Sequence, residues 1–147
     1  EMLERNYGHV VNVASMAAKV TTPGISVYCA TKYAVAALSR AVRAEIADTD
    51  VSITTLMPTA VHTELTAGVS LNLLPTRQPE QIAETIADSA RRPGREVTVP
   101  WWLAPFGAIE EVTPEPLMQR LKRIATRNEP PGHFDEHRRR GYLDRIG

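Results

Sequence analysis

The chain has 147 residues, of which 43% are hydrophobic and 23% charged, and its formal net charge at pH 7 is zero. This length suffices for one compact core and is too short for two full domains. The balanced charge argues against nucleic acid as the main partner. The single cysteine, Cys29, excludes an internal disulfide framework and a multi-cysteine metal site. No signal peptide or bilayer-length apolar run occurs, so we expect a cytoplasmic protein.

The first predicted element is a strand over residues 9–14, an apolar run with three valines between Gly8 and Ser15. Such a run is typical of a strand that is buried on both faces of a parallel sheet. Ser15 would then lie at the carboxyl end of the strand, where ligands bind in open α/β sheets. The alternative is an ordinary serine that caps a turn.

A loop with the turn signal Pro23–Gly24 separates this strand from a long helix, which we predict over residues 27–47. Alanine is frequent there and favours the helical state. Apolar residues at steps of three and four predict a buried stripe. Its members are Val35, Leu38, Val42 and Ile46.

Tyr28 and Lys32 lie one turn apart near the start of this helix, so their side chains project from the same face. An ammonium group beside a phenol favours the ionised phenol. Such a pair is a candidate proton donor and acceptor. Ser15, thirteen residues before Tyr28, would add a hydroxyl that can hold a carbonyl or alcohol oxygen.

The next strand is predicted over residues 51–57 and ends at Pro58, which completes a strand–helix–strand unit with parallel strands. Residues 63–78 then form an apolar segment without clear periodicity, interpreted as a flap on the substrate side. A further helix begins at Pro79, and residues 96–99 form a last strand. The buried stripe of this helix is predicted at Ile82, Ala83, Ile86, Ala87 and Ala90.

Residues 101–147 differ from the rest: an apolar patch that begins with Trp101 and Trp102 precedes an amphipathic helix and a basic tail, expected to be flexible. We expect this patch either to cover a substrate pocket or to form a contact between subunits. Peripheral membrane contact is the minority alternative. His133 and His137 lack the further ligands of a metal site, so no metal is expected.

Together these motifs resemble the short-chain dehydrogenase/reductase family. The strand that ends in Ser15, the Tyr28-x-x-x-Lys32 helix, and the strand followed by Pro58 and Thr63 occur in the family's order and spacing. The resemblance is strong over residues 8–66, loose over residues 75–100 and fades beyond. It implies an α/β fold in which residues 1–100 are the C-terminal portion of a doubly wound, parallel-sheet Rossmann domain, and residues 101–147 a helical extension.

The resemblance also implies an NAD- or NADP-dependent oxidoreductase that transfers hydride between the nicotinamide and a carbonyl/alcohol substrate, which the apolar flap suggests is nonpolar. Tyr28 would donate the proton, Lys32 would bind the nicotinamide ribose, and Ser15 would hold the substrate oxygen. Cofactor contacts are further implied at the end of the second strand. They are Pro58, Thr59, Val61 and Thr63, with Thr59 standing where the family usually has glycine.

Several alternatives remain at this stage. No glycine-rich dinucleotide fingerprint occurs, so we expect the C-terminal part of a longer protein or of a truncated gene. A non-catalytic binding module is one rival, and an epimerase or dehydratase of the same superfamily is another. A homo-oligomer is implied by the resemblance alone.

Overall fold

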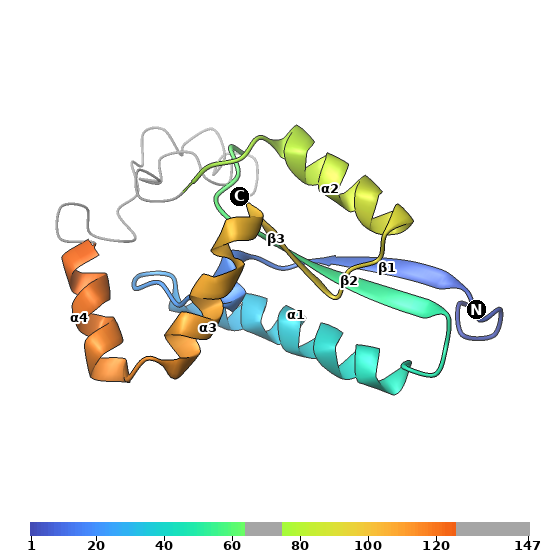
Figure 1. Ribbon diagram of the computed structural model, residues 1–147, viewed down its shortest axis with the longest axis horizontal. Coiled ribbons are helices and arrows are strands. Elements are labelled where there is room, and N and C mark those ends of the chain that lie inside the picture. Colours follow the sequence, from blue (N-terminus) through green and yellow to red (C-terminus); the bar gives the residue numbers. More distant parts are fainter. Residues whose placement is uncertain (64–74, 126–147) are drawn as a thin grey trace, which may run out of the picture.

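The computed structural model describes residues 1–63 and 75–125, and its centre is a three-stranded parallel sheet (Figure 1). The strands are β1 (Gly8–Val13), β2 (Val51–Pro58) and β3 (Glu96–Val99), in the order β1-β2-β3. The predicted α/β class and parallel pairing are thus observed, and β3 has the bounds that the sequence predicted.

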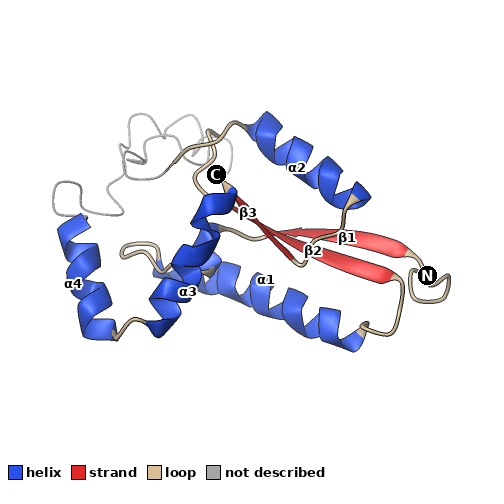
Figure 2. Ribbon diagram, viewed as in Figure 1, coloured by secondary structure: helices blue, strands red, loops and turns tan. Residues whose placement is uncertain are grey.

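Helices lie on both sides of this sheet. Figure 2 shows α1 (Ser26–Glu45), which connects β1 to β2, on one side, and α2 (Pro79–Arg91), which precedes β3, on the other. After β3 the chain continues through α3 (Ala104–Val112) and α4 (Glu115–Ala125), toward the end of the sheet where the strands finish. Two short 3₁₀ helices, η1 and η3, span Met16–Ala18 and Trp101–Leu103.

Local sequence explains where α2 begins. Pro79 occupies the first turn, where its missing N–H costs no hydrogen bond. The side chain of Gln81 reaches back and accepts a hydrogen bond from the Gln78 N–H at 3.1 Å. Glu80 adds a negative charge at the positive end of the helix. The start predicted at Pro79 is therefore confirmed.

The core is built on the central strand, β2, whose residues are buried from Ile53 onward. Leu56 and Met57 are fully buried. Two buried threonines precede them, and Thr54 donates its hydroxyl to the Gly94 carbonyl at 2.7 Å. Met57 packs in a cluster whose other buried members are small: Ala14, Ala18 and Ala36. Small side chains at these positions let α1 and η1 approach the sheet closely.

The predicted burial of β1 on both faces is wrong for the residues described. Most of the strand is half-buried, and Val13 is 46% exposed. Within the described chain, β1 pairs on one side only, with β2, from Gly8 opposite Val51 to Val13 opposite Leu56. An apolar sequence shows that both faces of a strand could be buried. Whether they are buried depends on the strand's position in the sheet.

The predicted stripe of α1 is also partly wrong. Leu38 is 60% exposed, whereas the buried positions are Cys29, Ala36 and Ser39. Ser39 accepts a hydrogen bond from the Asn12 side chain of β1 at 2.9 Å. The helix therefore turns its small residues toward the sheet, which places Leu38 on the far side.

The stripe of α2 is narrower than predicted. Ile82 and Ser89 are buried and Ile86 is half-buried, while the predicted alanines are exposed. These alanines are Ala83, Ala87 and Ala90. Because Ile82 and Ser89 are two turns apart, the helix contacts the sheet along one narrow line.

Candidate active site

Ser15 lies directly beyond β1, at the carboxyl edge of the sheet. Its backbone is extended, and its Oγ accepts a hydrogen bond from the Ala17 N–H at 3.1 Å, which caps η1. The predicted alternative, a serine that caps a turn, is therefore observed. This cap uses only one lone pair of the Ser15 oxygen. A serine hydroxyl has a further donor hydrogen. Ser15 can thus cap the turn and still donate to a substrate oxygen.

Tyr28 and Lys32 lie on the first two turns of α1, as the sequence predicted. The Lys32 Nζ is 5.7 Å from the centre of the Tyr28 ring, within the range of a cation–π contact. The same nitrogen donates to the Val13 carbonyl at 3.3 Å. Lys32 thus joins the start of α1 to the end of β1, two residues before Ser15. Tyr28 is 40% exposed, so its phenol is open to a ligand.

The four residues implied at the end of β2 share this carboxyl edge with Ser15. Pro58 pairs with Val99, and the Thr59 N–H donates to the Val99 carbonyl at 2.9 Å. Val61 forms a parallel bridge with Arg77. The Thr63 hydroxyl lies 3.5 Å from the Val61 carbonyl. The structure therefore holds this segment by backbone pairing.

Thr59 replaces the glycine that the family pattern would have, and the structure explains how a threonine is accommodated. Among the described non-glycine residues, Asn6 has a positive φ angle and Thr59 does not. The backbone at this position therefore needs no left-handed conformation. The Thr59 side chain itself is buried.

The segment that follows is only partly described. Most of the flap predicted over residues 63–78 lies outside the described residues. Its last part returns to the site, because the Arg77 N–H donates to the Ala60 carbonyl and the Arg77 carbonyl accepts from the His62 N–H, both at 2.9 Å. His62 is exposed beside this pairing.

With the geometry in place, comparison with known proteins decides the family. The sequence profile of the family described as short chain dehydrogenase matches residues 1–73. The chain belongs to the short-chain dehydrogenase/reductase family.

Curated relatives extend this similarity past the profile. Estradiol 17-beta-dehydrogenase 11 of Rattus norvegicus is 34% identical over 125 residues, covering 83% of this short-chain dehydrogenase chain and 42% of the relative. The chain thus spans about two fifths of the length of the curated relatives that it matches over most of its own length.

Solved structures show the same fold. A short chain dehydrogenase from Burkholderia cenocepacia, in complex with NADP, superposes with a TM-score of 0.67 at 23% identity, covering 81% of this chain and 50% of that one. The closed form of serine dehydrogenase, complexed with NADP+, superposes with a TM-score of 0.57 at 25% identity, covering 66% of this chain and 45% of that one. The Rossmann-type fold of this short-chain dehydrogenase chain is therefore shown.

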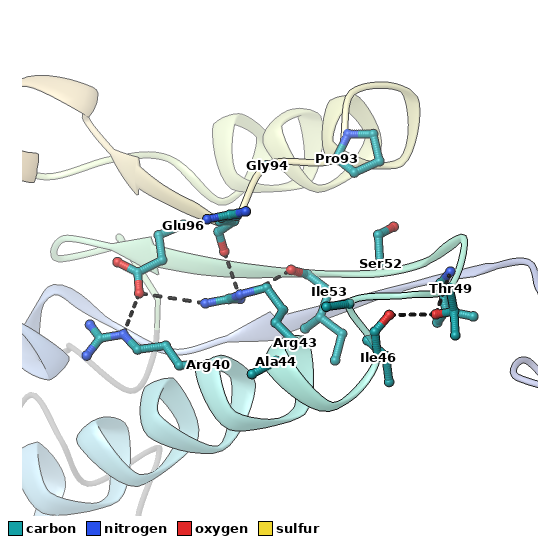
Figure 3. A pocket seen from close by; sticks show the side chains of 13 residues that line it. Arg40, Arg43, Ala44, Ile46, Thr49, Ser52, Ile53, Pro93, Gly94 and Glu96 are labelled. Carbon is teal, nitrogen blue, oxygen red and sulfur yellow. Dashed lines mark hydrogen bonds and ion pairs between the residues drawn. The ribbon is translucent and has the colours of Figure 1, made fainter.

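An open cavity of about 810 Å³ lies elsewhere on the molecule, between the C-terminal half of α1, the start of β2 and the segment that leads into β3 (Figure 3). None of the sequence-predicted site residues line it. Its charged side chains bind one another: Glu96 pairs with Arg40 at 2.7 Å and lies 3.8 Å from Arg43. Arg43 also donates to the carbonyls of Ile53 and Arg95. These mutual contacts indicate a structural network centred on Glu96, at the start of β3 beside Thr55 of β2.

Glu96 is the centre of this network and also reaches toward the site. Its second oxygen pairs with the Lys19 Nζ at 3.0 Å, and Lys19 ends the turn that Ser15 caps. Burial alone would raise the pKa of Glu96, but hydrogen bonds from Arg40 and Lys19 outweigh burial and hold the pKa below its ordinary value.

Sequence reasoning missed a second carboxylate, Glu110 on α3. Its Oε1 accepts hydrogen bonds from the Thr21 N–H at 2.9 Å and the Thr21 hydroxyl at 2.5 Å, and the Lys122 Nζ donates to the same oxygen at 2.6 Å. Thr21 belongs to the loop between Ser15 and Tyr28. These partners are 89 and 12 residues away from Glu110, and no local motif marks the long-range contact.

No group of three or more histidine, cysteine or acidic side chains in residues 1–63 and 75–125 could hold a metal ion, and His133 and His137 lie outside these ranges. No helix among the described residues is long and apolar enough to cross a membrane.

Proposed function

We propose that this chain carries the catalytic side chains of an NAD(P)-dependent oxidoreductase that acts on an apolar alcohol or carbonyl compound. The observation that carries the proposal is the position of Lys32, whose ammonium contacts the Val13 carbonyl and lies beside the Tyr28 ring. In this proposal the phenol, the ammonium and the hydroxyl of Ser15, two residues after Val13, act together at one edge of the sheet. These are the groups that a carbonyl reduction needs for proton transfer and for holding oxygen.

The donor groups present fit the nicotinamide end of a dinucleotide. A lysine ammonium has three N–H donors, and the Val13 carbonyl takes one of them, which leaves donors for ribose hydroxyls. The segment from Pro58 to Thr63, which includes Thr59 and Val61, lies at the same edge. It would border the nicotinamide ring and its carboxamide.

In the reduction direction, Ser15 holds the carbonyl oxygen by a hydrogen bond while Tyr28 donates its phenolic proton to that oxygen. Lys32 keeps a positive charge beside the phenol and orients the ribose. When bound, the nicotinamide supplies the hydride that reaches the carbonyl carbon, and it accepts that hydride in the reverse reaction. Fixing the oxygen between two hydroxyls lowers the barrier by positioning and by stabilising developing negative charge.

The substrate class is proposed from the relatives. Curated relatives named for estradiol and hydroxysteroid oxidation align over more than four fifths of this chain. A steroid or another apolar ring alcohol is therefore the first class to test. The half-exposed ring of Tyr28 is compatible with such a substrate.

The test uses the protein made from the complete coding region that contains this chain. Oxidation of estradiol and of a panel of other apolar alcohols is followed by NADH and NADPH absorbance. We expect turnover with at least one of them, and Tyr28→Phe should lower kcat by about 10²-fold or more, because the general acid is lost. Tyr7→Phe, which removes the hydroxyl of a tyrosine that is 74% exposed and precedes β1, is the matched control.

Near-normal turnover of Tyr28→Phe would remove Tyr28 as the proton donor. Turnover without net change in the cofactor would favour the epimerase or dehydratase alternative. No catalysis with any substrate, together with retained ligand binding, would favour the binding-module alternative.

A homo-oligomer is part of the proposal. Val27 and Leu38 on α1 are 77% and 60% exposed. Their separation of eleven residues corresponds to about three turns, so they share one face of the helix. This apolar face supports contact with a second copy, which the mass of the complete protein in solution would check.

A further inference from the structure

The segment between Ser15 and α1 links two of the proposed catalytic side chains. Apart from the short helix η1, residues 16–25 contain no helix or strand, and the turn at Gly24 has a φ angle of 83°. The path of such a segment depends on its contacts with other elements. Its path also sets how Ser15 and Tyr28 face a substrate, since one residue precedes the segment and the other follows it.

Glu110 provides one of these contacts. Three hydrogen bonds converge on its Oε1: two come from Thr21, in the middle of the segment, and one comes from Lys122 of α4. Lys122 also donates to the Thr21 hydroxyl at 2.6 Å. One carboxylate oxygen therefore ties the segment to both C-terminal helices.

Gly107 provides a second contact one turn earlier on α3. It is buried, and a Cβ atom at this position would lie 2.8 Å from the Lys19 Cβ. Only glycine lets the helix lie this close to the Lys19 stem. Because Gly107 and Glu110 are three residues apart, the same face of α3 covers the segment at Lys19 and at Thr21.

The charge of Glu110 strengthens this attachment. Its side chain is 14% exposed. Burial alone would raise the pKa of Glu110, but the hydrogen bonds from Lys122 and Thr21 outweigh burial and hold the pKa below its ordinary value. Hydrogen bonds to charged groups are about twice as strong as neutral ones. The neighbouring Glu111 is exposed.

We propose that Glu110 is a positioning residue through which α3 and α4 hold the segment 16–25 in place. The segment in turn holds Ser15 and Tyr28 at the separation that the substrate requires. This inference rests on the proposed function. It gives the C-terminal helices a role in substrate affinity that the Tyr28 and Lys32 motif does not include. Figure 1 shows α3 crossing beside the start of α1, where this segment ends.

The experiment uses Glu110→Gln in the complete protein, because glutamine keeps the shape and one acceptor oxygen, removes the charge and places an NH2 group where the second oxygen lies. We expect amide hydrogen exchange at Thr21 to be about tenfold faster, since a hydrogen bond to a charged group is weakened. We expect the KM for the carbonyl substrate to rise about fivefold or more, with kcat and the Kd of the cofactor within about twofold of wild type. Lys122→Met should act in the same direction, and Lys122→Arg should restore the wild-type values.

Glu111→Gln is the matched control, because it removes the same charge from the next residue of α3, and it should change neither KM nor Thr21 exchange. Unchanged Thr21 exchange and unchanged KM in Glu110→Gln would overturn the proposal. Equally faster exchange in β2 would also overturn it, because the residue would then stabilise the whole fold. The exchange measurement needs no turnover, so it decides this proposal even where the proposed oxidoreductase activity fails.

Discussion

Lys32 shows how one side chain can serve the fold and the chemistry together. Its ammonium contacts the Val13 carbonyl at 3.3 Å and lies 5.7 Å from the Tyr28 ring centre. The first contact joins α1 to β1, and the second sets the charge beside the phenol. A lysine can do both because its long stem reaches the strand while its three donors remain at the tip.

Lys32→Ala should therefore weaken cofactor binding as well as turnover in the complete protein. We expect the Kd for NAD(P)H to rise about tenfold or more, since a hydrogen bond from a charged donor is lost. Fluorescence titration of the reduced cofactor measures this change. Lys19→Ala is the control, because it removes a lysine that lies at the same edge but pairs with Glu96. It should leave the Kd for NAD(P)H within about twofold of wild type. An unchanged Kd in Lys32→Ala would remove the ribose role.

At the scale of elements, α3 is attached to the carboxyl edge of the sheet more closely than its sequence suggested. Sequence reasoning placed residues 101–147 in a separate extension, and that division stays a prediction. Yet α3 contacts the loop after Ser15 through Gly107 and Glu110. It also lies near Tyr33 of α1, whose pKa is raised by burial and by the charges of Glu110 and Glu111.

Gly107→Ala tests this packing by the sign of its effect. Helix propensity alone predicts a gain of about 1 kcal/mol for alanine over glycine inside a helix. Overpacking against the Lys19 stem costs roughly 1–3 kcal/mol and should outweigh that gain. We expect a lower Tm in thermal unfolding. A higher Tm would mean that α3 does not lie on Lys19 in solution.

At the scale of the whole molecule, two half-buried acidic side chains connect distant parts of the chain. Glu96 joins β3 to α1 and to the turn after Ser15. Glu110 joins α3 to Thr21, in the loop before α1, and to α4. Both have pKa values below their ordinary value, so each favours the folded state when ionised.

Stability should therefore fall with acid. A carboxyl group with a depressed folded-state pKa contributes stability that is present above its unfolded pKa and is lost as pH falls through the folded-state pKa. For these two groups that window lies below the ordinary value of 4.5. We expect the free energy of unfolding from urea titrations to drop as the pH falls below about 4.5. The variant with both Glu96→Gln and Glu110→Gln should show a shallower drop, and an identical pH profile would contradict the assignment.

The sequence by itself determined the three strands, the helices α1, α2 and α4, their order and the candidate side chains, whereas α3 lies in what the sequence predicted as an apolar patch. Local patterns made these predictions possible: the spacing of Ser15, Tyr28 and Lys32, the proline at the start of α2 and the short apolar strands. Such patterns do not depend on which other element a segment packs against. Only the tertiary structure decided that Leu38 faces outward and that β1 is half-buried. Burial depends on what an element packs against, and Glu110 meets Thr21 across 89 residues of chain, where no periodicity reaches.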